Sequence, residues 1–433
     1  VEGVPMAAFL IVACWACGLP CSRSSLIAGV RTSLRSNAAV LRMAIPHYVT
    51  GDMVNELAED AAVSMLGNIE TVPVTLSPSL ATGPVSATFV RTRVSAGEVP
   101  PLVVIHGFDS SCLEFRRLMP ELERRGIEAY AFDVFGWGFA DTSSASTVSV
   151  EAKREHLHAF WMEVLGGRPM ALAGVSLGAA VIIDFHAAHP EAVACAALID
   201  PQGFIDGAPP VPEPFARAGI QVLGSWPLRS FANQLAYHDT ATFATDDAIR
   251  VGLLHCARPG WADDSVDWLL GGGYSVSHLV PRLAAVNTLV MWGRQDQILP
   301  PQDFLPKFVR ALPNAAFRWV EECGHSPHLE QPSILADALA AFLRGEVVAG
   351  DSDVSEVVAR ANRTPLQVAQ SRVAAINAFL DTPILDTNER GGPLEPLKAW
   401  VRTEPEVAQV GASVVAVSFF AVTFGSAFGT FLY

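Results

Sequence analysis

Apolar runs of strand length alternate with amphipathic segments through the middle of the chain. Runs rich in Val, Ile, Leu and Ala predict strands at 101–106, 128–133, 170–174, 196–200, 288–292 and 317–320. Segments of helical character separate most of them, as at 151–165 and 332–344. Strands that alternate with helices form a mostly parallel sheet with helices on both faces, and continuous apolar strands indicate burial on both sides. The pattern therefore predicts an α/β fold, with its main domain over 72–345.

Residues 202–279 interrupt this alternation. They are rich in Pro, Trp and Gly, and we expect them to form a helical lid inserted after a strand. Aromatic side chains at the entrance of a site would favour an apolar substrate, although packing within the lid would equally explain them. The aromatic residues concerned are Phe204, Phe215, Trp226, Phe231, Tyr237, Trp261 and Trp268.

The N-terminal region is typical of a targeting segment. An apolar run at 6–19 precedes a stretch rich in Arg and Ser that contains no acidic residue before Asp52. A signal-like part followed by a transit-like part predicts a presequence over 1–45 and a plastid location. A mitochondrial presequence and a membrane anchor remain alternatives. Residues 46–71 are then an N-terminal extension of the main domain.

The C-terminal region differs again. Residues 346–409 form a charged connector, and residues 410–433 carry no charge. At 1.5 Å per residue the uncharged segment would reach about 36 Å as a helix, enough to cross a hydrocarbon layer of about 30 Å. We expect a single C-terminal transmembrane helix. Ala421, Gly425 and Gly429 are spaced by four, which would let a helix of a membrane-protein complex approach closely.

Composition excludes some classes of function. The 433 residues carry a formal net charge of −15, which argues against a nucleic-acid partner. The 7 cysteines are sparse and odd in number, so no disulfide framework is expected. Cys14, Cys17 and Cys21 have zinc-like spacing without a nearby histidine, and we expect no metal and no cofactor. Four further cysteines should be reduced and mostly buried: Cys112, Cys195, Cys256 and Cys323.

A Gly-Val-Ser-Leu-Gly sequence lies where one predicted strand meets a helix. It matches the G-x-S-x-G turn that exposes a nucleophilic serine, here Ser176. The Leu177 backbone N–H would lie at the helix N-terminus and stabilise an oxyanion. The His106-Gly107-Phe108 loop follows an earlier strand, and the Phe108 N–H would be the second donor. His106 lies too early in the chain to be the base and is expected to bond its own loop.

An acid and a base follow two later strands. Asp296 and His325 come after Ser176 in the order Ser, Asp, His that is expected when such a turn starts a triad. His325 would take the serine proton and Asp296 would hold the imidazole tautomer. Asp200 also ends a strand and is an alternative acid. His328 is expected to be a solvent or loop histidine rather than a catalyst.

Several motifs together resemble the α/β-hydrolase superfamily: HGFDSS, GVSLGAA, WGRQDQILP and CGHSPHLEQP. More narrowly, FDVFGWGFADT, KREHLHAFW, LLHCARPGWADD and GGGYSV are similar to plant and algal plastid α/β-hydrolases of undefined substrate. This resemblance implies the α/β-hydrolase fold over about 72–344. Phe135 stands where these proteins usually carry an Arg, and it should be an aromatic at the rim of the site.

The leading hypothesis is a serine hydrolase that cleaves a carboxylic ester of an apolar lipid or pigment-type substrate at a plastid membrane, thylakoid or other. The alternative is a subunit of a thylakoid complex that uses the hydrolase fold as a scaffold with little or no catalysis, because fold alone does not imply activity. A third hypothesis uses the same triad for C–C bond cleavage or for acyl transfer to an acceptor other than water.

Overall fold

The computed structural model describes residues 41–42, 45–95, 97–207 and 211–346. These residues form a nine-stranded sheet in the order β1-β2-β3-β5-β4-β6-β7-β8-β9. Strands β4 to β9 pair in parallel, whereas β1 to β3 join antiparallel at one edge. The strands are β1 (Leu41–Arg42), β2 (Glu70–Val74), β3 (Val85–Arg91), β4 (Leu102–Ile105), β5 (Ala129–Phe132), β6 (Met170–Val175), β7 (Val193–Ile199), β8 (Asn287–Gly293) and β9 (Ala316–Val320). The predicted mostly parallel sheet is confirmed.

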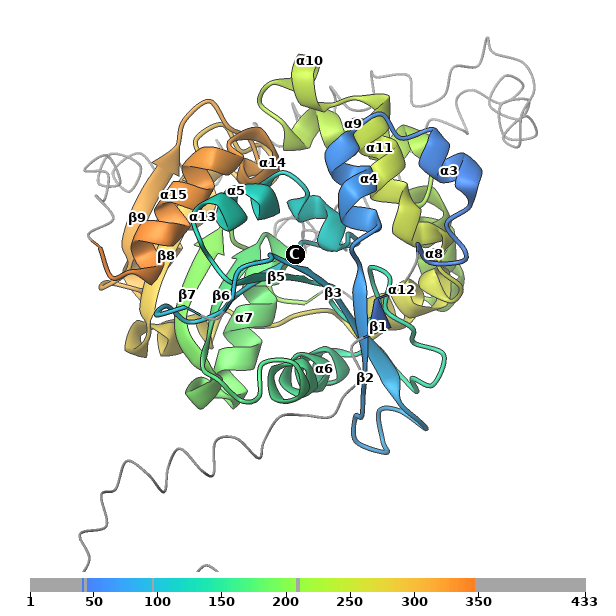
Figure 1. Ribbon diagram of the computed structural model, residues 1–433, viewed down its shortest axis with the longest axis horizontal. Coiled ribbons are helices and arrows are strands. Elements are labelled where there is room, and N and C mark those ends of the chain that lie inside the picture. The colour runs from blue at the N-terminus through green and yellow to red at the C-terminus, as the bar shows by residue number, and fades with distance from the viewer. Residues whose placement is uncertain (1–40, 43–44, 96, 208–210, 347–433) are drawn as a thin grey trace, which may run out of the picture. The chain divides into compact units, whose positions relative to one another are not determined.

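Helices cover both faces of this sheet, as predicted (Figure 1). Helices α5 (Leu118–Arg124) and α15 (Pro332–Leu343) pack together on one face, and α6 (Val150–Glu163) and α7 (Leu177–Ala188) pack on the other. Strand residues Val104 and Ala173 share a fully buried cluster with Leu122 of α5 and Leu339 of α15. The remaining helices of the sheet layers are α13 (Pro301–Ala311) and the short α14 (Pro327–Glu330).

The segment between β7 and β8 is mainly helical, and we call it the lid. It comprises α8 (Glu213–Leu223), α9 (Trp226–Ala236), α10 (Thr240–Phe243), α11 (Asp246–Leu253), the 3-10 turn η3 (Leu254–Ala257) and α12 (Trp261–Leu270). Helices α3 (Gly51–Asn55) and α4 (Asp60–Leu66) lie beside the lid (Figure 1). Asp247 of α11 accepts hydrogen bonds from the N–H groups of Ala58 and Glu59, at 2.8 and 2.9 Å. The region before β2 therefore supports the lid.

The predicted segments at the two ends lie outside the described residues. These are residues 1–40 and 43–44 of the predicted presequence (1–45), all but the first residue of the predicted connector (346–409), and the predicted C-terminal helix with Ala421, Gly425 and Gly429. Among the residues that are described, none of the helices has the length and apolar character needed to cross a membrane. The thiols of Cys112, Cys195 and Cys323 are free and buried, and that of Cys256 is free and half-buried, as expected.

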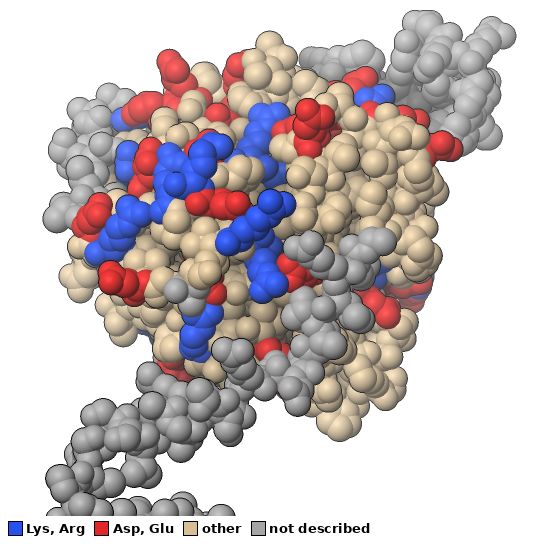
Figure 2. All heavy atoms as spheres, in the orientation of Figure 1, with Lys and Arg blue, Asp and Glu red and all other residues tan. Residues whose placement is uncertain are grey.

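Arginine side chains gather over α5 and α15, with acidic side chains among them (Figure 2). Arg125 lies 2.6 Å from Glu121 of its own helix and 2.7 Å from Asp337 of α15. Arg116 and Arg117 both pair with Glu59, at 2.7 and 2.6 Å. The positive charge of this face is therefore compensated locally.

Candidate active site

Ser176 stands on a sharp turn between β6 and α7. Its φ of +52° lies in a region that side chains rarely adopt, so the turn is strained. A Cβ at Gly174 would lie 2.4 Å from the backbone of Gly178, and a Cβ at Gly178 would lie 2.3 Å from the Ile105 carbonyl oxygen. Neither approach is possible for any residue but glycine. The two glycines of the motif therefore let the chain place Ser176 at the carboxyl edge of the sheet.

The predicted acid and base meet on neighbouring loops. Asp296 follows β8 and His325 follows β9, and His325 Nδ1 lies 2.8 Å from Asp296 Oδ2. The other Asp296 oxygen accepts from the N–H groups of Ile298 and Leu299, at 2.8 and 2.9 Å. A carboxylate partner assigns the His325 proton to Nδ1, which leaves Nε2 as a proton acceptor. Asp296 thus orients the imidazole as a general base requires.

The predicted nucleophile, Ser176, lies at the same edge of the sheet as the predicted base, His325. Within the described residues, the Ser176 hydroxyl makes no hydrogen bond to His325. Ser176 is half-buried, and β7 alone separates its strand from that of Asp296. Catalytic hydrogen bonds are often long in free enzymes and close when substrate binds. The structure therefore brings Asp296 and His325 into contact, and it places Ser176 on the turn between β6 and α7 at the same edge of the sheet.

The two predicted oxyanion donors flank Ser176. Leu177 is the first residue of α7, and Phe108 lies in the loop after β4. A Cβ at Gly107 would lie 3.4 Å from Ser176 Cβ, so this loop passes close to the nucleophile. In the part of the chain that is described, neither the Phe108 nor the Leu177 N–H donates a hydrogen bond. Both donors are available to a bound oxygen.

His106 holds the loop that carries Phe108. Its Nδ1 lies 2.8 Å from the Gly107 carbonyl oxygen, and its Nε2 accepts from the Val134 N–H at 3.0 Å. Burial lowers the pKa of His106 to about 4, so the ring stays neutral and keeps both bonds. His106 therefore binds the loop and has no free nitrogen to act as a base.

The alternative acid, Asp200, lies beside the pair but is not bonded to His325. Its Oδ1 accepts from the Gly293 N–H at 2.8 Å, and its buried Oδ2 has no partner among the described residues. Burial, and then the charge of Asp296, raise the pKa of Asp200 well above its usual range. Burial therefore disfavours the charged form of Asp200, whereas the imidazole needs a negative partner.

The atoms of Asp200, Asp296 and His325 lie within 4.8 Å of one another, a spacing that could suit a cation. Asp296, however, already accepts four N–H groups, from Ile298, Leu299, His325 and the Trp292 indole. A carboxylate offers about four acceptor sites, so none remains for an ion. The donor set fits a catalytic pair better than a metal centre.

Two expectations about neighbouring residues are wrong. Phe135 is fully buried and stacks on His156 of α6 with the ring centroids 4.7 Å apart, so it packs in the core instead of lining the rim. His328 is also fully buried, and its Nε2 lies 3.1 Å from Glu114 Oε1. It lies in α14 and is neither a solvent nor a loop histidine.

Glu330 is a positioning residue that the motifs do not reveal. Its Oε1 accepts from the Gly324 N–H at 2.7 Å, and its Oε2 accepts from the N–H groups of His238 and Asp239, at 2.8 and 3.1 Å. The His325 N–H donates in turn to the Ala236 carbonyl oxygen at 2.6 Å. The loop of the base is therefore bound to the end of lid helix α9.

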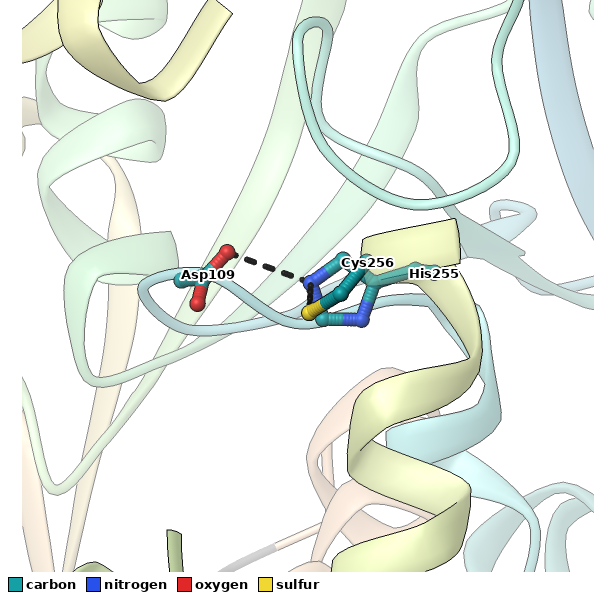
Figure 3. Close-up of side chains that lie close together, drawn as sticks. All are labelled: Asp109, His255 and Cys256. Atoms are coloured by element: carbon teal, nitrogen blue, oxygen red, sulfur yellow. Dashed lines mark hydrogen bonds and ion pairs between the residues drawn. The ribbon is translucent and has the colours of Figure 1, made fainter. Parts of the chain in front are cut away.

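A second carboxylate joins the lid to the other side of the site. Asp109, the residue after Phe108, lies 3.2 Å from His255 Nε2 of the lid (Figure 3). It also accepts from the indole N–H of Trp261, another lid residue, at 2.8 Å. Both partners come from the sequence LLHCARPGWADD, which is one of the stretches that resemble plastid hydrolases. The resemblance therefore singled out the lid stretch that takes part in this contact, but nothing in that stretch indicates that Asp109 is its partner.

Comparisons with known proteins show the family to which the chain belongs. The sequence profile of the alpha/beta hydrolase family matches residues 102–338. The chain is 35% identical over 297 residues to alpha/beta hydrolase domain-containing protein VTE7 of Arabidopsis thaliana, covering 68% of this chain and 89% of that protein. It is 26% identical over 258 residues to Lipase 1 of Psychrobacter immobilis, covering 57% and 77%. The chain belongs to the alpha/beta hydrolase family.

The fold is also similar to that of a thermophilic esterase from Thermogutta terrifontis. The TM-score is 0.52 at 21% sequence identity, and the match covers 64% of this chain and 98% of the esterase. Family membership, with a lipase among the related sequences, supports a hydrolase.

Proposed function

We propose that the chain is a serine hydrolase that cleaves a carboxylic ester of an apolar substrate through Ser176, His325 and Asp296. The observation that carries this proposal is the 2.8 Å contact between His325 Nδ1 and the buried Asp296 carboxylate, on loops beside the Ser176 turn. A neutral imidazole held by a carboxylate on one nitrogen has its other nitrogen ready to accept a proton.

The reaction needs no group beyond the chain's own residues and water. Ser176 Oγ attacks the ester carbonyl while its proton passes to His325 Nε2, and Asp296 stabilises the imidazolium. The N–H groups of Phe108 and Leu177 bind the developing oxyanion. The C–O bond then breaks, and the alcohol leaves with the proton from His325. Water, activated by His325, hydrolyses the acyl-enzyme to the free acid.

An apolar substrate is supported by the aromatic side chains around the Phe108 loop. The half-buried Phe108 ring packs against Trp137 and against Trp268 of the lid, with centroids 5.3 and 5.2 Å apart. Rings of this kind form apolar surface beside the oxyanion donors. We therefore propose an acyl lipid or a pigment-type ester as the substrate class.

The membrane part of the proposal rests on the sequence of the two ends. The presequence pattern of 1–45 supports a plastid, and the uncharged 410–433 segment supports attachment to a plastid membrane. Alkaline washing of isolated plastid membranes tests the anchor. We expect the full chain to stay in the membrane fraction and a chain ending at 409 to be released, and release of both would contradict the anchor.

A fluorophosphonate probe tests the chemistry directly. We expect the full chain to be labelled and Ser176→Ala to remain unlabelled. Ser149→Ala is the matched control, because it removes a hydroxyl that caps α6 and should label normally. A panel of acyl-lipid and isoprenoid-alcohol esters then defines the substrate class. Equal labelling of Ser176→Ala, or a wild-type chain that neither labels nor cleaves any ester, would overturn the proposal and favour the scaffold alternative.

A further inference from the structure

Asp109 is a buried carboxylate in the loop that carries the proposed oxyanion donor. It follows Phe108 directly, and its side chain is 1% exposed. Its φ of +47° lies in the region that favours glycine, so the loop holds it in a strained conformation. Such strain persists only when surrounding contacts over-determine the position. The contacts of Asp109 with the lid provide that constraint.

Three lid elements converge on this single carboxylate. From α9, Arg229 donates to Asp109 Oδ2 through one nitrogen and to the Asp109 carbonyl oxygen, at 3.2 Å, through the other. From α12, the Trp261 indole N–H donates to Oδ1 at 2.8 Å. From η3, His255 Nε2 lies 3.2 Å from the same oxygen (Figure 3). We call Asp109, Arg229, His255, Cys256 and Trp261 the Asp109 cluster.

The charges of the cluster favour an ionised carboxylate. Burial alone would raise the pKa of Asp109, but Arg229 and then His255 outweigh it and hold this pKa well below its usual range. Burial likewise opposes the charged form of His255, yet Cys256 and Asp109 raise its pKa to about 9. Asp109 is therefore an anion between two cations at neutral pH.

A metal ion fits this cluster poorly. Atoms of Asp109, His255 and Cys256 lie within 4.8 Å of one another, as metal ligands would (Figure 3). Both Asp109 oxygens, however, already accept N–H groups, and Arg229 Nη2 lies 3.5 Å from Cys256 Sγ. A cation would have to displace a buried guanidinium, so the cluster attaches protein elements to one another.

The neighbouring residue attaches the same loop to the lid a second time. The Phe108 ring contacts Trp268 of α12, while Gly107 passes close to Ser176. Two consecutive residues of one loop thus depend on the lid for their position. The backbone N–H of the first of them is the donor that must meet the oxyanion within a few tenths of an ångström.

We propose that Asp109 is a positioning residue that attaches the lid to the oxyanion loop, so that release of the lid displaces the Phe108 N–H. This inference rests on the proposed function for its catalytic part. Its structural part, the attachment of α9, η3 and α12, stands on the contacts alone.

The test uses two variants that break the same contact from opposite sides. Asp109→Asn keeps an acceptor for Trp261 but presents an amide N–H₂ to Arg229, and Arg229→Gln removes the guanidinium from the lid side. Arg217→Gln is the matched control, because Arg217 is an exposed lid residue that pairs with the exposed side chains of Glu213 and Asp263. The substrate is p-nitrophenyl acetate, whose acyl group is too small to depend on lid contacts. Amide hydrogen exchange of the lid helices is measured in parallel.

Both cluster variants should lose at least about 10-fold in kcat on this small ester with a smaller change in KM, because an oxyanion donor acts on the transition state. Exchange in α9, η3 and α12 should rise, while exchange in β4 to β9 should not. The double variant should lose no more than the worse single one, since both remove one interaction. Arg217→Gln should match the wild type in kcat and in lid exchange.

The outcomes separate the two parts of the inference. Unchanged lid exchange in both variants overturns the attachment, and increased exchange with kcat within about 2-fold of wild type overturns its link to the oxyanion loop. If one variant does not fold, the other gives the same two measurements. If the wild-type chain cleaves no ester, the proposed function has failed, and lid exchange still decides whether Asp109 holds the lid.

Discussion

Replacing Asp296 by asparagine tests the acid–base pair most directly. All four acceptor positions of the Asp296 carboxylate receive N–H groups. An amide supplies only one oxygen. If that oxygen faces Ile298 and Leu299, the new N–H₂ group faces His325. The imidazole must then accept at Nδ1 and carry its proton on Nε2, which is the nitrogen that should take the serine proton.

The expected loss follows from this change of tautomer. The equivalent substitution in a Ser-His-Asp triad lowers kcat by about 10⁴, which is about 5 kcal/mol of transition-state stabilisation. The free energy of unfolding should fall by less, about 2 kcal/mol, because the amide N–H₂ turns toward the Trp292 indole N–H that Oδ2 now accepts. The assay is kcat on p-nitrophenyl acetate, together with the rate of fluorophosphonate labelling and a urea titration of the folded chain.

Asp200→Asn is the matched control for this prediction. Burial and the charge of Asp296 disfavour the charged form of Asp200, and an amide oxygen in place of its Oδ1 can still accept from Gly293. The substitution should therefore change kcat by less than about 10-fold, which corresponds to 1.4 kcal/mol. If Asp200→Asn abolishes activity while Asp296→Asn retains it, the assignment of the acid is refuted.

Three further predictions concern the supports of the site. Gly178→Ala should lower the free energy of unfolding by about 3 kcal/mol in a urea titration, because the new Cβ would lie 2.3 Å from the Ile105 carbonyl oxygen. Glu330→Gln should cost about 2 kcal/mol in the same measurement, because the amide turns a donor toward N–H groups that the carboxylate now accepts. The pKa of His255 is raised from 6.5 in the unfolded chain to about 9 in the folded chain. Protonated His255 therefore stabilises the fold fully below pH 6.5, and this stabilisation is lost as the pH rises through 9. The wild-type chain should therefore lose roughly 3 kcal/mol more than His255→Gln between pH 6.5 and 10.

Matched controls accompany these variants. Gly219→Ala on α8 meets nothing within 4 Å and should keep or raise stability. Glu321→Gln removes an exposed pair with Arg294 and should cost less than about 1 kcal/mol. If the controls lost as much free energy of unfolding as Gly178→Ala and Glu330→Gln, the explanations by close approach and by burial would be contradicted. An unchanged pH dependence in His255→Gln would show that another group titrates.

The parallel strands could be predicted because burial on both faces leaves a continuous apolar run. The antiparallel edge escapes this pattern for a physical reason. β2 reads Glu-Thr-Val-Pro-Val with alternating burial, and Pro73 cannot donate to a sheet ladder. Among the described residues, β1 pairs only with Glu70 and Thr71, so it needs no donor from Pro73. A search for continuous apolar runs does not detect a strand with this alternating pattern.

The proposed triad residues could be named from the sequence because each follows a strand and belongs to a local motif. The residues that hold the site in position could not be named from the sequence, since their contacts depend on which elements pack together. His328 and Phe135 lie in or near motifs, yet both are buried against residues far away in the chain, Glu114 and His156. The sequence does not predict that these residues meet. Asp109 and Glu330 gain their roles from lid segments more than 90 residues away in the chain.

Helix α9 contacts both chemical halves of the site. Near its start Arg229 binds the oxyanion loop through Asp109, and at its end the Ala236 carbonyl oxygen receives the N–H of His325. Its 11 residues span about 16 Å, so this one helix connects the two loops of the candidate site. A rigid-body shift of α9 would move the Asp109 loop and the His325 loop together. If these loops carry the roles proposed above, a ligand that displaces this one helix would disturb the oxyanion donor and the general base at the same time.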